Sequence, residues 1–141
     1  MTYPIRLPAM LLALSAFTAQ AAPPKNAVLV DHSSANLIDA ATARTMLAEA
    51  IPARVWKLYP ASKWGYVTEV EGGFNGAGIC VVTARAMMMQ LTPTVKAMLY
   101  RPRKTSTAFD ALPNATREQC KALAKTKLRE AIDSVVSGLV S

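Results

Sequence analysis

The sequence predicts an α+β domain in which two helices cover one face of a three- or four-stranded antiparallel sheet, as a two-layer sandwich. Three observations support this prediction. Two runs with strand-like alternation flank a glycine-rich turn, an amphipathic segment follows near the end of the chain, and each of these parts carries one of the two cysteines. The predicted element order is α-β-β-β-α, with a possible weak strand before the first helix.

The first 21 of the 141 residues resemble a secretory signal peptide. Arg6 provides the positive charge, and residues 7–17 form an apolar run too short to span a bilayer. Ala19 and Ala21 fit the small-x-small pattern that precedes signal cleavage. We therefore expect cleavage after Ala21 and a soluble mature protein in the periplasm or outside the cell.

Residues 22–38 are expected to form a flexible segment with a short edge strand at 27–30. Residues 39–141 are then expected to form the single domain. Asp39 is a suitable N-cap for a helix over 39–50, which Pro52 ends or kinks.

Another turn or two of helix is predicted over 54–59, and Pro60 stops it. Residues 64–71 and 79–89 are predicted to form a hairpin. A two-residue turn at Asn75 and Gly76 would place Glu69 and Glu71 on the face of Cys80. A three-residue loop over 74–76, with Gly76 in the left-handed region, separates polar from apolar residues and is preferred. The expected inner face then holds Trp64, Tyr66, Val70, Cys80, Val82, Ala84 and Met88.

The segment after the hairpin is predicted to contain a strand over 95–101, a turn over 101–104 and a weaker fourth strand over 104–109. Proline at position 102 and the cluster of charges favour the turn. The Ser and Thr content makes the fourth strand the weakest of the predicted elements.

The clearest helix begins after Thr116, where Gln119 completes a capping-box pattern. Asn114 is a competing cap. The helix is expected to reach about residue 136, with Gly138 as a stop signal. Its apolar stripe contains Cys120, Leu123, Ala124, Leu128, Ala131 and Val135.

Cys80 and Cys120 are predicted to form a disulfide, because cysteines of exported proteins usually pair. The bond would join the inner face of the hairpin to the apolar stripe of the last helix. A reactive cysteine beside Lys121 is the less favoured alternative. No metal site is expected, because the chain has one histidine and no Cys-x-x-Cys spacing.

The formal net charge of +7 permits binding to an anionic envelope component, although a modest positive charge also simply aids solubility. Nucleic acid is not an expected partner of an exported chain with few aromatic residues. No cofactor is expected, since the sequence has no glycine-rich phosphate-binding loop. The basic turn at Arg101, Arg103 and Lys104 is the candidate anion-binding site.

The outer side of the hairpin carries an apolar strip that we call the outer strip: Ile79, Val81, Met87 and Met89. Flexible methionines suit adaptable binding surfaces. The strip is therefore a candidate interaction surface, unless the N-terminal segment or the first helix covers it.

The remaining site signals favour structural explanations. His32 beside Asp31 is expected in a solvated loop, and Glu69, Glu71 and Arg85 are expected to form a surface charge cluster. The aromatic residues around Pro60 are expected to pack in the core rather than to line a groove: Trp56, Tyr59, Trp64 and Tyr66. The glycosylation sequon at residues 114–116 is interpreted as incidental.

These observations favour a small exported, non-enzymatic protein that binds another protein or an anionic envelope component. The alternative is a small envelope hydrolase or an enzyme-inhibitor-like protein with a cleft between helix and sheet. That alternative requires polar residues that converge in a deep pocket. The sequence shows no catalytic nucleophile–base motif.

Overall fold

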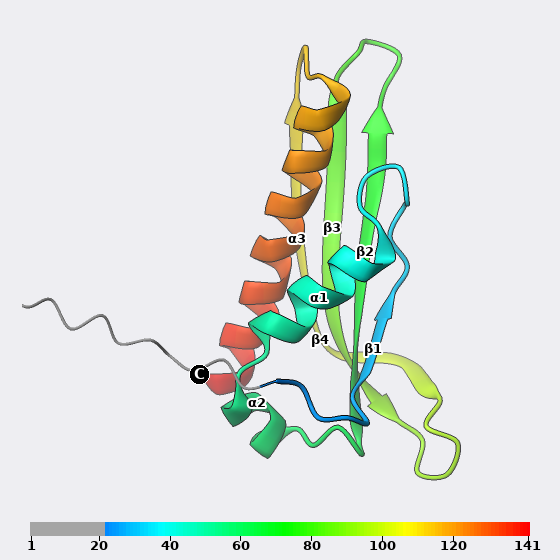
Figure 1. Ribbon diagram of the computed structural model, residues 1–141, viewed down its shortest axis with the longest axis vertical. Helices are drawn as coiled ribbons and strands as arrows, with labels where there is room; N and C mark the ends of the chain where they lie inside the picture. Colours follow the sequence, from blue (N-terminus) through cyan, green and yellow to red (C-terminus); the bar gives the residue numbers. More distant parts are fainter. Residues whose placement is uncertain (1–21) are drawn as a thin grey trace, which may run out of the picture.

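Within residues 22–141, four strands form one sheet, and every helix lies against the same face of it (Figure 1). The computed structural model describes residues 22–141, so the predicted signal peptide and its cleavage site lie outside the described residues. The strand order is β1-β2-β3-β4. The strands are β1 (Val28–Asp31), β2 (Trp64–Phe74), β3 (Cys80–Leu91) and β4 (Met98–Leu112).

The helices are α1 (Ala40–Ala50), α2 (Ala53–Leu58) and α3 (Arg117–Val140). Asp39 caps α1 by accepting a hydrogen bond from the Thr42 N–H at 2.8 Å. Thr116 caps α3 through the predicted capping box with Gln119. The α+β fold class and the element order are therefore confirmed, with α2 as the additional short helix.

The sheet is mixed rather than fully antiparallel. β1 runs parallel to β2, with Val28 opposite Gly65 and Asp31 opposite Thr68, whereas the other two pairings are antiparallel. The chain that joins β1 to β2 contains α1 and α2, and a crossover of this kind returns a strand in the same direction. The prediction of an antiparallel sheet was wrong for this one edge.

The predicted faces of the hairpin are confirmed, but the predicted turn is wrong. Glu69 lies opposite Arg85, so even-numbered residues of both strands face the helices. The last ladder pair is Phe74 with Cys80, and the loop lies over residues 75–79. Gly78, not Gly76, is in the left-handed region, with φ 72°. The Asn75 side chain accepts from two backbone N–H groups within this loop, which favours the longer connection.

β4 is a single long strand, so the predicted turn over 101–104 is wrong. It passes through Pro102, which lies opposite Met89 at a register irregularity. Proline is tolerated in a sheet on edge strands and at bulges, because no ladder hydrogen bond is lost there. The predicted strand start at 95 was also early, since Val95 is 76% exposed in the connection before β4.

α3 continues past the predicted stop at Gly138 and ends at Val140. A Cβ built on Gly138 would lie 2.5 Å from Lys104 Cε, so the lysine stem of β4 passes over the helix at this glycine. The glycine therefore provides space for a neighbouring side chain and does not end the helix.

The core lies between the helices and the inner face of the sheet. Even-numbered residues of β2 and β3 pack there with the apolar stripe of α3, as predicted. The fully buried large side chains include Tyr66, Leu47, Ile51, Met88, Leu128, Ile132, Val55, Val70, Val82 and Val135. Leu37 and Ile38 are also buried, so the core begins before the domain boundary expected at 39.

The predicted disulfide is present between Cys80 and Cys120, with a Cα–Cα distance of 5.7 Å. Cys80 is the first residue of β3, and Cys120 lies in the first turn of α3. The bond thus fixes the beginning of α3 to the end of the sheet that carries the hairpin turn.

Candidate interaction surfaces

The face of the sheet opposite the helices, here called the outer face, is formed by odd-numbered residues of β2 and β3. The four residues of the outer strip lie on this side of the hairpin but differ in exposure. Val81 is 39% exposed, Ile79 and Met87 are half-buried, and Met89 is buried. Within residues 22–141, the helices pack in the core on the opposite face of the sheet, and none of them covers the outer face.

Met89 is buried within a second, smaller apolar group on the outer face. Val67, Met89 and Leu91 are each less than 7% exposed, yet they lie outside the main core. Met98 lies opposite Leu91, and a Cβ built on Gly65 would be 2.8 Å from Met98 Cε. The start of β4 therefore covers this end of the outer face.

The other end of the outer face is open. Phe109 of β4 is 77% exposed and lies opposite Thr83, next to the pair formed by Val81 and Ala111. We define Val81 and Phe109 as the apolar corner. Sequence reasoning missed Phe109, because it was assigned to the weakest predicted strand and its register against β3 was not predicted.

The charged cluster predicted on the outer face consists of an ion pair and a neighbouring carboxylate. Arg85 Nη1 donates to Glu69 Oε2 at 3.2 Å. Glu71 lies two residues further along β2, opposite Thr83, and is exposed. Cross-strand pairs of opposite charge stabilise a sheet modestly. The arrangement is that of a surface pair rather than of an acid and a base in a cleft.

The three predicted anion-binding residues do not all line the same groove. Arg101 and Arg103 line an open groove of about 520 Å³ together with Trp64, whereas Lys104 extends over Gly138 of α3. The groove provides two guanidinium groups beside an aromatic ring. Such a site suits an anion, but it lies on a strand rather than on the predicted turn.

The aromatic residues around Pro60 form two edge-to-face pairs. The ring centroids of Trp56 and Tyr66 are 5.4 Å apart, and those of Tyr59 and Trp64 are 5.8 Å apart. Edge-to-face geometry is a favourable packing arrangement for aromatic rings. The first pair is buried in the core, as expected, while Trp64 also reaches the groove beside Arg101.

Two polar atoms of the first aromatic pair are buried without a partner among the described residues. They are Trp56 Nε1 and the Tyr66 hydroxyl. Burial, followed by the nearby Tyr59, raises the pKa of Tyr66 far above its usual value of 10.0. Tyr66 therefore stays neutral, and its hydroxyl has no catalytic base beside it in the described chain.

His32 is not coupled to Asp31. The Asp31 carboxylate accepts hydrogen bonds from Ser33 Oγ at 2.6 Å and from Thr68 Oγ1 at 2.8 Å. These contacts satisfy the hydroxyl of Thr68, which is fully buried. The His32 side chain is exposed, while its backbone N–H donates to the Thr68 carbonyl. Asp31 thus joins β1 to β2 and does not orient an acid–base histidine.

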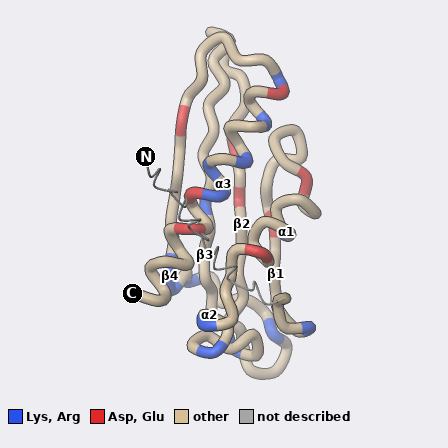
Figure 2. The backbone as a smooth tube through the Cα atoms, turned by 60° about the vertical axis from the view of Figure 1, so that its left-hand side comes forward, with Lys and Arg blue, Asp and Glu red and all other residues tan. Residues whose placement is uncertain are grey.

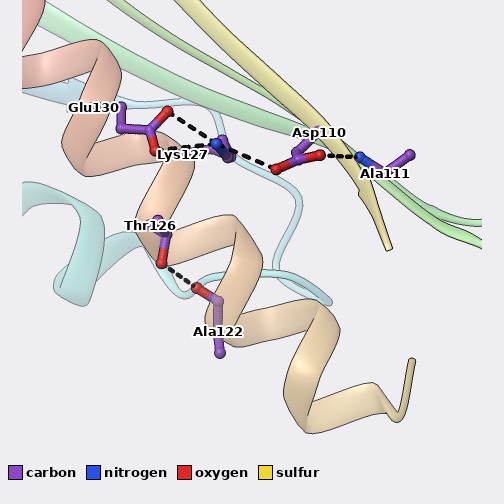
Figure 3. A network of polar contacts seen from close by, with 6 residues as sticks. All are labelled: Asp110, Ala111, Ala122, Thr126, Lys127 and Glu130. Atoms are coloured by element: carbon purple, nitrogen blue, oxygen red, sulfur yellow. Dashed lines mark hydrogen bonds and ion pairs between the residues drawn. The ribbon is translucent and has the colours of Figure 1, made fainter. Parts of the chain in front are cut away.

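A polar network between α3 and β4 was not found by sequence reasoning (Figure 3). Lys127 Nζ lies 3.3 Å from Asp110 Oδ2 and 3.0 Å from Glu130 Oε2. The Asp110 carboxylate also accepts from the Ala111 N–H at 2.8 Å. The Ala111 N–H, together with Lys127, lowers the pKa of Asp110 below its usual value. Only the i,i+3 spacing of Lys127 and Glu130 was visible in the sequence.

A pocket of about 410 Å³ lies between the start of α3 and the end of β2. It contains Arg117 and Lys121, with the disulfide at its wall through Cys120. Lys121 is paired with Glu118 at 3.3 Å. Gly72 and Gly73 form the opposite wall with Phe74. The lining residues include no carboxylate, no histidine and no hydroxyl group.

Basic residues are spread along α3 and also gather around α2, at the end of the molecule opposite the hairpin turn (Figure 2). Across residues 22–141, no cluster of three or more His, Cys, Asp or Glu side chains could hold a metal ion. In the same part of the chain, no helix has both the length and the hydropathy needed to cross a membrane.

Comparison with known proteins gives structural likeness only. No family model and no curated protein sequence matches the chain. The dodecamer of PelC from Paraburkholderia phytofirmans is similar over 78% of this chain and 86% of its own, with 11% identity and a TM-score of 0.41. A second crystal form, of a PelC variant, gives 10% identity over 84% of this chain and 95% of that one, also with a TM-score of 0.41.

A protein of the DUF330 family from Xanthomonas campestris is also similar. It covers 81% of this chain and 81% of its own length, with 15% identity and a TM-score of 0.36. These low identities and scores assign no family to the chain and carry no argument about its function.

Proposed function

We propose that this chain is a small exported, non-enzymatic protein that binds another protein through the outer face of its sheet. The observation that carries the proposal is the apolar corner. Val81 is 39% and Phe109 is 77% exposed on a face that no helix of the described chain covers. Exposed large apolar side chains that adjoin on one face mark surfaces that bind a partner.

Export is part of the proposal and rests on two features. The first is the signal-like segment of residues 1–21. The second is the disulfide between Cys80 and Cys120, since structural disulfides persist in oxidising compartments such as the bacterial periplasm. Mass spectrometry of the protein from its native envelope should find Ala22 as the first residue.

The hydrolase alternative receives no support from the pocket between α3 and β2. An acid–base mechanism needs a side chain at the reacting atoms that can give or take a proton, most often His, Asp or Glu and sometimes Lys. The polar side chains in that pocket are Asn36, Arg117 and Lys121. The amine of Lys121 is paired with Glu118, and Cys120 is held in the disulfide. Glu69 and Arg85, which such an enzyme could use, lie on the outer face and bind each other.

The test is photocrosslinking in the native cell. A crosslinking residue is placed at Val81, at Phe109 or at Leu58, which is 55% exposed on α2 and serves as the matched control. We expect the first two positions to yield the same heterologous protein and the control to yield none. Adducts that contain only copies of this chain, or equal yields from all three positions, would refute the proposal.

A further inference from the structure

The unpaired edge of β4 differs from ordinary edge strands in its length and composition. β4 has 15 residues and, within residues 22–141, pairs only with β3. Its second half, residues 105–112 with the sequence TSTAFDAL, contains no proline, lysine or arginine. Such residues usually protect an exposed edge from pairing with another strand. The first half carries them all: Arg101, Pro102, Arg103 and Lys104.

Two hydrogen bonds at the ends of the β2–β3 pairing fix which backbone groups point to this edge. Leu91 N donates to Lys63 O, and Asn75 N donates to Ile79 O. Odd-numbered residues of β3 therefore bond to β2, and even-numbered residues bond to β4. Because Ala84 lies opposite Ala108 and Ala86 opposite Ser106, the even-numbered residues of β4 bond back to β3. The N–H and C=O groups of the odd-numbered residues of β4 then point outward.

Ala111 agrees with this alternation. Its N–H donates to the Asp110 side chain instead of to β3. Asp110 is itself held by Lys127 of α3, so this end of the edge is closed by a fixed carboxylate. The open part of the edge is therefore formed by the outward backbone groups of Thr105, Thr107 and Phe109.

We propose that this edge pairs with the same edge of a second copy of the chain, antiparallel, with the two-fold axis at Thr107. Charge complementarity selects this occupant and this direction. A two-fold axis at Thr107 places Lys104 opposite Asp110 of the second copy, twice. The Asp110 side chain is still half-exposed while it binds Lys127, so it can take a second cation. It also places Thr105 opposite Phe109 of the second copy. Parallel pairing would instead set the basic segment 101–104 against itself.

The alternation of β4 permits the same register. Residues that pair across a two-fold axis at Thr107 are both odd-numbered or both even-numbered, so outward N–H groups meet outward C=O groups. Odd-numbered side chains also remain on the outer face in both copies. The product is an eight-stranded sheet with helices on one side and a continuous outer face on the other.

The first experiment measures the mass of the disulfide-bonded mature chain by sedimentation velocity over a range of concentrations. Wild type is expected to dimerise. Thr107→Pro removes one outward N–H without removing a bond to β3, so it is expected to fold and to remain monomeric. Thr107→Val keeps the N–H and is the matched control, expected to dimerise like wild type. A wild-type chain that stays monomeric throughout, or a Thr107→Pro variant that dimerises normally, overturns the proposal.

A second experiment keeps the proposal testable if the proline variant does not fold. Residues at a hydrogen-bonded antiparallel position have Cα atoms about 5.5 Å apart, which is within disulfide range. Thr107→Cys should therefore crosslink two copies on a non-reducing gel. Thr105→Cys should not crosslink alone, but should do so when mixed with Phe109→Cys. Crosslinking of Thr105→Cys alone, or no crosslinking of Thr107→Cys, would exclude this register.

Discussion

Lys127 of α3 connects Asp110 of β4 to the helix, with Nζ 3.3 Å from Asp110 Oδ2. The contact joins the last helix to the strand at the edge of the sheet. The same carboxylate accepts the Ala111 N–H, so it serves both the helix–sheet packing and the unpaired edge. Since the contacts to Ala111 and Lys127 favour the ionised form, they lower the pKa of Asp110 from its usual value of 3.8.

The first prediction concerns acid stability. A carboxyl group whose pKa is lower in the folded state than in the unfolded state stabilises the fold at a pH above its unfolded-state pKa. This stabilisation is lost as the pH falls through the folded-state pKa. Stability from Asp110 should therefore decline below pH 3.8. Asp110→Asn keeps an oxygen for the Ala111 N–H but removes the titration. Thermal melts between pH 5 and 2.5 should show a shallower acid decline in the variant, and identical slopes would contradict the assignment.

The second prediction concerns the disulfide. Cys80 and Cys120 are 40 residues apart, and a crosslink that closes a loop of this length stabilises a fold by about 4 kcal/mol in the chain-entropy model. The double variant Cys80→Ala/Cys120→Ala should therefore melt well below the oxidised wild type. Reductant should lower the melting temperature of wild type and leave that of the variant unchanged. A wild-type melting curve that is unchanged by reductant would count against a stabilising role of the disulfide.

The third prediction compares two neighbouring glycines of β2. Gly72 and Gly73 both have positive φ, 128° and 141°. A Cβ on Gly72 would lie 2.0 Å from the Val81 carbonyl oxygen, whereas a Cβ on Gly73 meets nothing within 4 Å. Both alanine variants bear backbone strain of about 1–3 kcal/mol. Only Gly72→Ala must also displace the backbone of β3, so chemical denaturation should show it to be the less stable variant by at least about 1 kcal/mol. Equal losses would mean that the strand shifts freely there.

The fourth prediction concerns the buried hydroxyl of Tyr66. A buried polar group without a partner costs about 1–3 kcal/mol, so Tyr66→Phe should raise the unfolding free energy by about 1 kcal/mol. Tyr59→Phe, at a half-buried tyrosine, is the control and should change stability little. A clear loss of stability in Tyr66→Phe would show that the hydroxyl has a partner that stabilises the fold.

Tyr66 also predicts alkaline behaviour. Its pKa in the folded state is raised above the usual value of 10.0, mainly by burial. The folded state favours the neutral form of Tyr66. The free energy of unfolding is therefore unaffected by this group below pH 10 and decreases as the pH rises above 10. The decline should be smaller in Tyr66→Phe when melts are compared between pH 9 and 11.5. Parallel curves for the two proteins would contradict this assignment.

The fifth prediction concerns Gly138. Replacement of glycine by alanine inside a helix gains about 1 kcal/mol of helix propensity. The new Cβ would contact Lys104 Cε and Nζ, which belong to the end of an exposed and flexible side chain. Gly138→Ala should therefore be neutral or slightly stabilising in thermal melts. A marked loss of stability would mean that the Lys104 stem is fixed against the helix.

Local sequence signals predicted the hairpin faces, both caps and the disulfide, because each depends on alternation or spacing within a few residues. The parallel pairing of β1 was not predicted, since its partner follows only after α1 and α2. The sequence predicts a turn at Pro102 and therefore two strands in place of β4. The proline is tolerated within one strand because it lies at the sheet edge and at a register irregularity. The contact between Lys127 and Asp110 joins α3 to β4, and no local sequence pattern in either element predicts it.

The position of the disulfide also determines how the molecule should respond to force. Both ends of the described chain lie at the end of the molecule opposite the crosslink (Figure 1). A pull on the two termini would therefore peel β1 from β2 and unwind α3 from its C-terminal end, one contact after another. Extension from the α3 side would stop at Cys120, and the 40-residue interval back to Cys80, with β3 and β4, would bear no load. A protein tethered in this way would lengthen at low force by a fixed amount, while the pairing of β3 with β4 inside the crosslinked interval would carry no load.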